Sequence, residues 1–286
     1  APLLPRPHRR TYTHSNLLFL LTILILCPPL VASHMEKREG FRRFDHDTRR
    51  LPRPASDLST SLGLAPNDDG DLVVSIFLMG GCIGQYDVVV GGDGANDTPT
   101  QYRCAEVSDG TLVYDPTHDM FEDRARMPRK RYRHDSVVSG GDIWVVGGRD
   151  GNDEVVREID VYDPPRDKWI TVALLPPEFA VSDHAMWAHG DSIFIAGGYD
   201  RNRHAVPYTL EINAATTLLN HGGFDGAGVR PPVELVFERR ADMGTARGDV
   251  SGLNFGGTGY AVGGFSHEDG FCQPLATVEA YDPHTR

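Results

Sequence analysis

Charged and imidazole side chains recur at three places in this sequence, each directly before a run of apolar residues. These places are Arg133-His134-Asp135, Ser182-Asp183-His184 and Arg247-Gly248-Asp249. Arg149 and Tyr199 add a polar residue directly after paired glycines. Side chains of these types can bind a ligand through ion pairs and hydrogen bonds, or can bond to neighbouring segments of their own chain. The sequence favours the structural role and leaves ligand binding as the alternative.

No signature of enzymatic chemistry stands out in the sequence. We find no Gly-rich phosphate loop, serine nucleophile elbow or pair of catalytic carboxylates. The histidines are dispersed, and Cys27, Cys82, Cys104 and Cys272 include no C-x-x-C spacing. We therefore expect no catalytic residue, no metal site and no cofactor. One disulfide is compatible with these cysteines, but their spacing does not name the pair.

The apolar segments that carry these side chains repeat along the chain. Four of them end in paired glycines, at Gly91-Gly92, Gly147-Gly148, Gly197-Gly198 and Gly263-Gly264. The pairs lie 50 to 66 residues apart. That period fits one four-stranded blade of a propeller, and paired glycines suit a place where strand backbones crowd near a turn.

Aromatic residues follow the glycine pairs in a fixed order. Tyr114, Tyr162 and Tyr281 each close an apolar strand within a Tyr-Asp-Pro tripeptide. Phe121 and Trp169 come seven residues after the first two tyrosines. Aromatic side chains of this size bury about 150–250 Å² each, so we expect them to fill the space between adjacent blades.

This order of paired glycines, tyrosine and tryptophan resembles the kelch repeat, over residues 84–286. The resemblance implies an all-β, kelch-type β-propeller with three to four blades of four-stranded antiparallel sheets present as a partial ring. Kelch propellers typically close with six or seven blades. We therefore expect the sequence to be a fragment, incomplete at its C-terminus and monomeric if missing sequence completes the ring.

The blades are predicted to occupy residues 72–286. The strands of the first are expected at 72–79, 86–91, 111–115 and 121–125. Later blades follow at 134–174, 184–238 and 249–281, with an inserted loop at 213–232. Cys82 and Cys104 then fall at opposite ends of the first blade, so a bridge between them would require the longer loop to fold back.

The N-terminal residues are typical of an export signal. Residues 17–26 carry no charge, follow three arginines and precede small residues, which favours a signal peptide within residues 1–33. The run is about half of the roughly 20 residues that a bilayer span needs. An uncleaved membrane anchor, and a cytosolic protein starting at Met35, are the alternatives. Residues 34–71 are predicted to form a basic and polar, disordered linker.

The charge excludes one class of partner. The net charge is −12, although residues 1–55 hold ten Lys and Arg against four Asp and Glu. The remainder is therefore strongly acidic, and nucleic acid is not an expected partner.

We expect a non-catalytic binding module, secreted or at the cell surface, that engages a protein or a carbohydrate. Binding is expected on the face that carries the long polar loops within and between blades. The candidate ligand-binding residues are Arg133, His134, Asp183, His184, Arg247, Asp249, Arg149 and Tyr199.

The sequence leaves two other functions open. One is a kelch-propeller enzyme acting on carbohydrate, such as a copper oxidase or a sugar epimerase, although no matching motif lets those catalytic roles be transferred to this chain. The iron-binding run of plant kelch specifier proteins fails here, because Glu238 and Asp242 are followed by Ala246 where histidine is needed. The other is a cytosolic adaptor, which would normally need a partner domain that is not visible.

Overall fold

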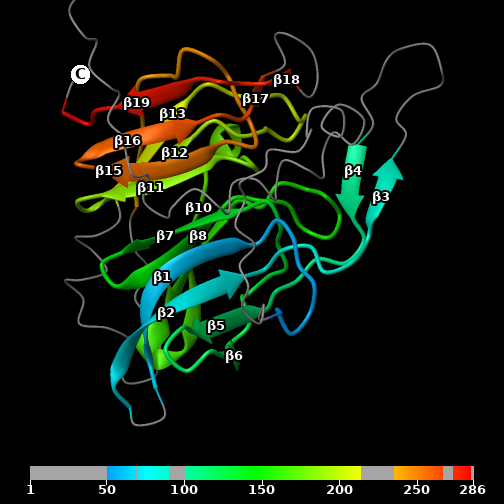
Figure 1. Ribbon diagram of the computed structural model, residues 1–286. Coiled ribbons are helices and arrows are strands. Elements are labelled where there is room, and N and C mark those ends of the chain that lie inside the picture. Colours follow the sequence, from blue (N-terminus) through cyan, green and yellow to red (C-terminus); the bar gives the residue numbers. More distant parts are fainter. Residues whose placement is uncertain (1–49, 68–69, 90–100, 214–234, 267–272, 285–286) are drawn as a thin grey trace, which may run out of the picture. The chain divides into compact units, whose positions relative to one another are not determined.

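Four antiparallel sheets follow one another along the chain (Figure 1). The computed structural model describes residues 50–67, 70–89, 101–213, 235–266 and 273–284. The first sheet contains β1 (Ser59–Pro66), β2 (Leu72–Met79), β5 (Thr111–Asp115) and β6 (Met120–Arg124). The second contains β7 (Asp135–Ser139), β8 (Asp142–Val146), β9 (Glu158–Asp163) and β10 (Lys168–Leu174). The third contains β11 (Ala185–His189), β12 (Ser192–Ala196), β13 (Thr209–Asn213) and β14 (Val236–Arg239). The fourth contains β15 (Ser251–Phe255), β16 (Thr258–Val262) and β19 (Val278–Tyr281).

The first strands of the sheets lie next to one another. Strand β1 contacts β7, β7 contacts β11, and β11 contacts β15. Each sheet is a meander that runs outward from this inner strand. The sheets are therefore four consecutive blades of a β-propeller, and the all-β propeller prediction is confirmed.

The first blade begins earlier than the sequence suggested. Its inner strand is β1, which lies inside the predicted linker, and the predicted inner strand at 72–79 is the second strand, β2. Small residues of β1 face the neighbouring blade and are buried, whereas Leu62 and Leu64 are 64% and 47% exposed. This outward placement of the leucines hid the strand, because alternation normally marks the apolar face as the buried one.

The second strand predicted for the first blade, at 86–91, was also wrong. Strand β3 (Tyr86–Val89) pairs with β4 (Gln101–Cys104) in a separate two-stranded hairpin (Figure 1). The glycine pair that ends the second strand of this blade is Gly80-Gly81, directly after β2. Gly91, Gly92, the N-terminal segment 1–33 and most of the insertion at 213–232 lie outside the described residues.

Paired glycines are needed where one blade meets the next. A Cβ on Gly147 would lie 2.4 Å from the carbonyl oxygen of Val181 in the third blade, and one on Gly148 would lie 2.6 Å from that of Tyr132. Both glycines also have positive φ, at +65° and +84°, where residues with a Cβ are disfavoured. The missing Cβ of the first glycine thus allows the neighbouring blade to pack closely, and that of the second allows the inner strand of the same blade to do so.

Of the two predicted aromatic pairs, one lies between blades, and the other lies on the face of the first blade that no other described blade covers. Tyr162 pairs with Trp169 across neighbouring strands, with ring centroids 4.9 Å apart, and Tyr114 pairs with Phe121 in the same way at 4.7 Å. Trp169 also donates a hydrogen bond from Nε1 to the carbonyl oxygen of Ala125, 2.8 Å away, at the end of the first blade. This side chain therefore joins the first and second blades.

Trp169→Ala should lower the free energy of unfolding by about 2–4 kcal/mol, because a half-buried ring and a hydrogen bond between blades are both lost. Phe121→Ala is the matched control, since Phe121 stacks on its tyrosine in the same way but belongs to the free face of the first blade. Urea titration followed by circular dichroism would compare the two. Equal losses, or a loss below about 1 kcal/mol at Trp169, would contradict its role between blades.

Two of the blades contain an ion pair of a buried arginine at the same place. The guanidinium of Arg131 pairs with Asp160 in the second blade, and that of Arg247 pairs with Glu279 in the fourth. Both arginine side chains are fully buried. Arg131 also donates to two carbonyl oxygens of its own blade, and Arg247 donates to three. The ion pair therefore holds the residues directly before the inner strand against the rest of the blade.

The blades at the two ends of the series each present an apolar face to solvent. Leu62, Leu64 and Val74 are exposed on the first blade, and Leu253 and Phe255 on the fourth. Between the inner blades, the corresponding faces are covered by a neighbouring sheet, as in the cluster around Trp144, Ile195 and Leu210. Exposed apolar faces of this kind commonly mark contact surfaces.

Helical structure is confined to single turns within the described residues. These are the 3-10 turns η1 (Pro164–Arg166) and η2 (Pro177–Phe179). Neither has the length to cross a lipid bilayer.

Candidate functional site

One residue with a left-handed backbone precedes the inner strand of every blade. These residues are Asp57, Arg133, Asp183 and Asp249, with φ values of 50°, 57°, 56° and 49°. We call these four residues the turn cluster. Positive φ is uncommon for residues other than glycine, and aspartate adopts it more readily than arginine does. The same strained turn is therefore repeated in all four blades.

Backbone hydrogen bonds link these turns from blade to blade. The amide of Arg133 donates to the carbonyl oxygen of Asp57 at 2.9 Å, and the amide of Asp183 donates to that of Arg133 at 2.8 Å. The amide of Val250, directly after Asp249, donates to the carbonyl oxygen of Asp183 at 3.4 Å. Side chains that lie 50 to 76 residues apart in sequence are thus brought together at one end of the inner strands.

The turn cluster combines three carboxylates with one guanidinium. Nε of Arg133 lies 3.7 Å from Oδ1 of Asp183, and the two side chains are 10% and 7% exposed. Burial opposes the charge of Arg133, but Asp183 and Asp57 outweigh it and raise the pKa of Arg133 above its ordinary value. Burial raises the pKa of Asp57. Burial, together with the negative charge of Asp183, raises the pKa of Asp249 to about 8.

Two tyrosines hold the outer aspartates of this cluster. The hydroxyl of Tyr199 donates to Oδ2 of Asp249 at 3.0 Å, and the hydroxyl of Tyr86 donates to Oδ2 of Asp57. A Cβ on Gly248 would lie only 2.3 Å from Cε2 of the Tyr199 ring, so position 248 requires glycine. Burial, followed by the nearby charge of Asp249, raises the pKa of Tyr199 and keeps it a hydrogen-bond donor.

Tyr86 reaches the cluster because a disulfide closes the hairpin that carries it. Cys82 is bonded to Cys104, with their Cα atoms 5.7 Å apart. Tyr86 pairs directly with Cys104 across β3 and β4. The hairpin therefore folds back as such a bridge requires. Sequence spacing had left the pair open, and Cys27 and Cys272 lie outside the described residues.

The loops of the second and third blades are tied together beside the cluster. Arg149 donates from Nε to Oγ of Ser182 at 3.0 Å, and from its two terminal nitrogens to the carbonyl oxygens of Asp153 and Asp200, each at 2.8 Å. Arg203 of the third blade also forms an ion pair with Asp153 of the second. The loop surface is therefore held in place before any ligand arrives.

The structure separates the eight predicted ligand-binding residues into two groups. Arg133, Asp183, Asp249 and Tyr199 come together in or beside the turn cluster. The other four are buried in structural positions: His134 and His184 pack against glycines of the preceding blade, Arg247 pairs with Glu279, and Arg149 joins the loops. Neither ring nitrogen of His184 has a hydrogen-bond partner among the described residues, and burial lowers its pKa to about 4.

Two residues of the site were missed, Asp57 and Tyr86. The sequence contains a signal for the first, because Ala55-Ser56-Asp57 before β1 parallels Val181-Ser182-Asp183 before β11. The inner strand predicted at 72–79 excluded residue 57 from the first blade. Tyr86 has no counterpart in the other blades, so the repeat pattern offered no signal for it.

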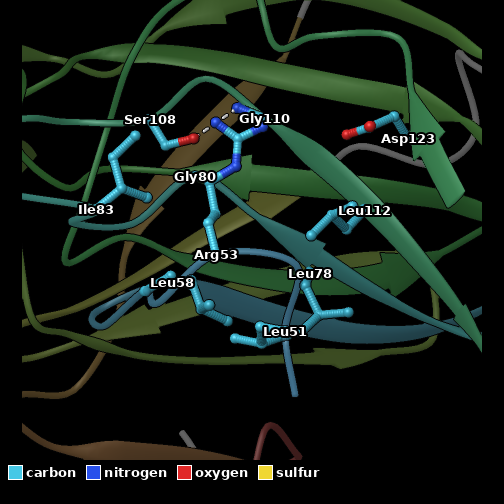
Figure 2. Close-up of a pocket in the computed structure, with 11 residues that line it drawn as sticks. Leu51, Arg53, Leu58, Leu78, Gly80, Ile83, Ser108, Gly110, Leu112 and Asp123 are labelled. Atoms are coloured by element: carbon cyan, nitrogen blue, oxygen red, sulfur yellow. Dashed lines mark hydrogen bonds between the residues drawn. The ribbon is translucent and has the colours of Figure 1, made fainter. Parts of the chain in front are cut away.

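A small pocket lies elsewhere, on the first blade. It measures about 30 Å³ and is lined mainly by apolar side chains, with Arg53 and Asp123 among the polar ones. Figure 2 shows Arg53 extending between Gly80 and Gly110, beside Ser108, with leucines below. Ligand pockets for small organic molecules usually measure about 300–1,000 Å³. This pocket has room for about two water molecules, and we assign it no ligand.

The repeat that builds this site matches a known family. A protein-family model described as "Kelch motif" matches residues 130–173, which span the second blade and the turn that carries Arg133. The chain is a kelch-repeat protein. The glycine pairs of the other blades, and the pairing of Tyr114 with Phe121 in the first blade, follow the same pattern.

Known relatives of the kelch-repeat chain extend well beyond it. Alpha-scruin of Limulus polyphemus is 33% identical over 84 residues, which is 29% of this chain and 9% of that protein. Kelch-like protein 36 of Rattus norvegicus is 27% identical over 217 residues, which is 63% of this chain and 35% of that protein. The solved structure of YjhT aligns with a TM-score of 0.49 and 12% identity, covering 76% of this chain and 74% of that chain. The kelch-repeat chain thus spans about a third or less of the length of these two curated relatives.

Asp249→Asn should raise the free energy of unfolding at about pH 8 by more than about 1 kcal/mol. The folded-state pKa near 8 lies above the ordinary value of 3.8, so the fold favours the protonated carboxyl. Stability of the unmodified protein should therefore fall as the pH rises from about 4 to about 8, and the variant should remove the part due to Asp249. Urea titrations at several pH values would measure this. An equal effect at pH 5 and pH 8 would contradict the raised pKa.

Proposed function

We propose that this chain is a non-catalytic binding module that engages a protein partner. The binding face consists of the turn cluster, its two tyrosines and the adjoining loops 149–156 and 199–206. The observation that carries the proposal is the convergence of charged side chains from four blades at one end of the inner strands. Buried charges are costly unless they are fully paired, and Oδ2 of Asp183 has no partner among the described residues.

The neighbouring loops supply a rigid rim for such a partner. In the second blade, Oδ1 of Asp150 accepts hydrogen bonds from the amides of Asn152 and Glu154. In the third blade, Oδ1 of Asp200 accepts from the amides of Asn202 and His204 in the same way. Loops that are ordered in advance lose less conformational entropy on association. Charged groups beneath an ordered rim suit a protein better than an uncharged sugar.

Selection of binders from a random peptide library displayed on phage would test this function on the full chain. Asn152→Arg and Asn202→Arg place bulk on the exposed loop tips, and Asp191→Arg is the control at the opposite end of the third blade. We expect selected peptides to lose at least about tenfold in affinity with the loop variants and to be unaffected by the control. Selected peptides whose affinity is the same for the loop variants and the unmodified protein would overturn the proposed face. A carbohydrate array that gave binding sensitive to the same variants, with no such peptides, would overturn the protein partner.

We also propose that the protein is exported. The support is the signal-like segment at residues 1–33 together with the Cys82–Cys104 disulfide, because structural disulfides persist mainly in oxidising compartments. N-terminal sequencing of the mature protein tests this, with a start near His34 as the expected result. A mature protein that begins at Met35 and carries free thiols at both cysteines would overturn it.

A further inference from the structure

The charges at the floor of the proposed face do not balance. Two cations act on the carboxylates there, Arg133 and Arg149, and they face three aspartates in the turn cluster. Arg149 is already committed, since all three of its nitrogen groups donate to neutral oxygen acceptors. Once Asp249 is ionised, at about pH 8 and above, one negative charge therefore remains in excess at a buried site, where the cost of an unpaired charge is high.

The excess is located most clearly at Asp183. Its side chain is 7% exposed, and the distance from Arg133 Nε to its Oδ1 is 3.7 Å, too long for a hydrogen bond. Its other oxygen, Oδ2, has no partner among the described residues, and neither has Nε of Arg133. Asp57 and Asp249 differ in this respect, because each accepts a hydrogen bond from a tyrosine. Asp183 is thus a buried acceptor at the centre of the cluster whose capacity is unused.

We propose that the turn cluster binds one ammonium or guanidinium group from the partner protein, attracted by the carboxylate of Asp183. This inference rests on the proposed function and names the chemistry that the binding face recognises. A side chain of lysine or arginine would supply the missing positive charge. An acidic partner is disfavoured, because the guanidinium of Arg133 is surrounded by three aspartates and adds no net positive charge.

A bound metal ion would also neutralise the excess negative charge. No group of three or more His, Cys, Asp or Glu side chains in the described part of the chain is arranged to hold one. Hard cations such as Ca²⁺ need six to eight oxygen ligands at about 2.3–2.6 Å. A guanidinium or ammonium group instead needs only a few acceptor oxygens.

The binding of such a cation should depend on pH. Asp249 faces Asp183, Asp57, Arg133 and Tyr199, and its pKa of about 8 reflects burial and the surplus of carboxylates. A bound cation favours the ionised carboxylate, so binding releases protons from this group. The affinity for a cation should therefore rise between about pH 6 and pH 8.

Two small probes would test the proposal on the full chain. N-acetylarginine methylamide carries the guanidinium, and N-acetylcitrulline methylamide has nearly the same shape without the charge. Isothermal titration calorimetry, with competition experiments for weak binding, gives both affinities. We expect the arginine probe to bind at least about tenfold more tightly, and its affinity to rise from pH 6 to pH 8 while that of the citrulline probe stays constant.

Substitutions then place the site. Asp183→Asn preserves shape and should reduce the preference for the arginine probe to about threefold or less, whereas Asp191→Asn, in an exposed turn at the opposite end, should leave it unchanged. Asp249→Asn is the second variant, and it should remove the pH dependence. Thermal melts would show that each variant is folded.

Three results would overturn the inference: equal affinity for the two probes, an arginine preference that persists in Asp183→Asn, or no saturable binding of the arginine probe. These results differ from a failure of the proposed function. Library peptides that bind the loop face but carry no lysine or arginine would keep the binding face and remove the cationic ligand. Peptides whose affinity is unchanged by the loop variants would contradict both the binding face and the cationic ligand.

Discussion

Replacing Asp160 with alanine should lower the free energy of unfolding by about 3–5 kcal/mol. The side chains of Asp160 and Arg131 are both fully buried and form an ion pair. Burial lowers the pKa of Arg131 to about 10 even with its partner present, so the surroundings solvate this cation poorly. Without Asp160, the guanidinium would be left with the carbonyl oxygens of Gly147 and Glu158 alone. Urea titration followed by circular dichroism measures the loss.

The third blade supplies the control for this experiment. Val181 stands where the second blade has Arg131, Leu210 stands where it has Asp160, and both are fully buried in the apolar core. The double variant Arg131→Val with Asp160→Leu should therefore stay within about 1–2 kcal/mol of the unmodified protein. Arg129, which also contacts Asp160, is 25% exposed and can turn to solvent. A double variant as unstable as Asp160→Ala would show that the charge left behind is not the cause.

Gly147→Ala should lower the free energy of unfolding by about 2–5 kcal/mol, the sum of backbone strain at positive φ and overpacking. The new Cβ would lie 2.4 Å from the carbonyl oxygen of Val181 and 2.7 Å from Cε1 of His184. Both atoms belong to the third blade, and the backbone oxygen cannot move without shifting the inner strand. The contact between the second and third blades is therefore expected to open or distort. Differential scanning calorimetry and urea titration would report it.

Gly190→Ala separates the two contributions. Gly190 also has positive φ, at +57°, but a Cβ there would meet no atom within 4 Å. This control should lose only about 1–2 kcal/mol, from backbone strain. If the two alanine variants were equally stable, Gly147 would be needed only for the conformation of its own turn and not for the contact between blades.

The strands of the second, third and fourth blades could be predicted because their signals are local. In the second blade, the glycine pair at 147–148, Tyr162 and Trp169 lie within 25 residues. They mark the end of β8, strand β9 and strand β10 in sequence order. Phe237 shows the limit of such signals. It pairs with Ile212 across β13 and β14, but the loop inserted at 213–232 separates the two residues in sequence, so no local pattern identifies this aromatic as the partner.

The first blade shows why alternation can mislead. Ser59, Ser61 and Ala65 are the buried residues of β1, because the space beside Phe77 is too narrow for larger side chains. A Cβ on Gly63 would lie 2.8 Å from that ring. The strand therefore has its small residues inside and its leucines outside, which is the reverse of the usual pattern.

The sequence by itself determined the kelch-repeat architecture, because each blade is one continuous stretch whose glycines and aromatics are dictated by packing against a similar neighbour. Only the tertiary structure decided which polar residues act together. Asp57, Arg133, Asp183 and Asp249 meet because three successive blade contacts place their turns side by side, and Tyr86 joins them because a disulfide folds its hairpin back. Nothing in the local sequence distinguishes Asp183, with its unused oxygen, from Arg247, whose charge is satisfied within its own blade. That difference depends on which charges the neighbouring blades bring close.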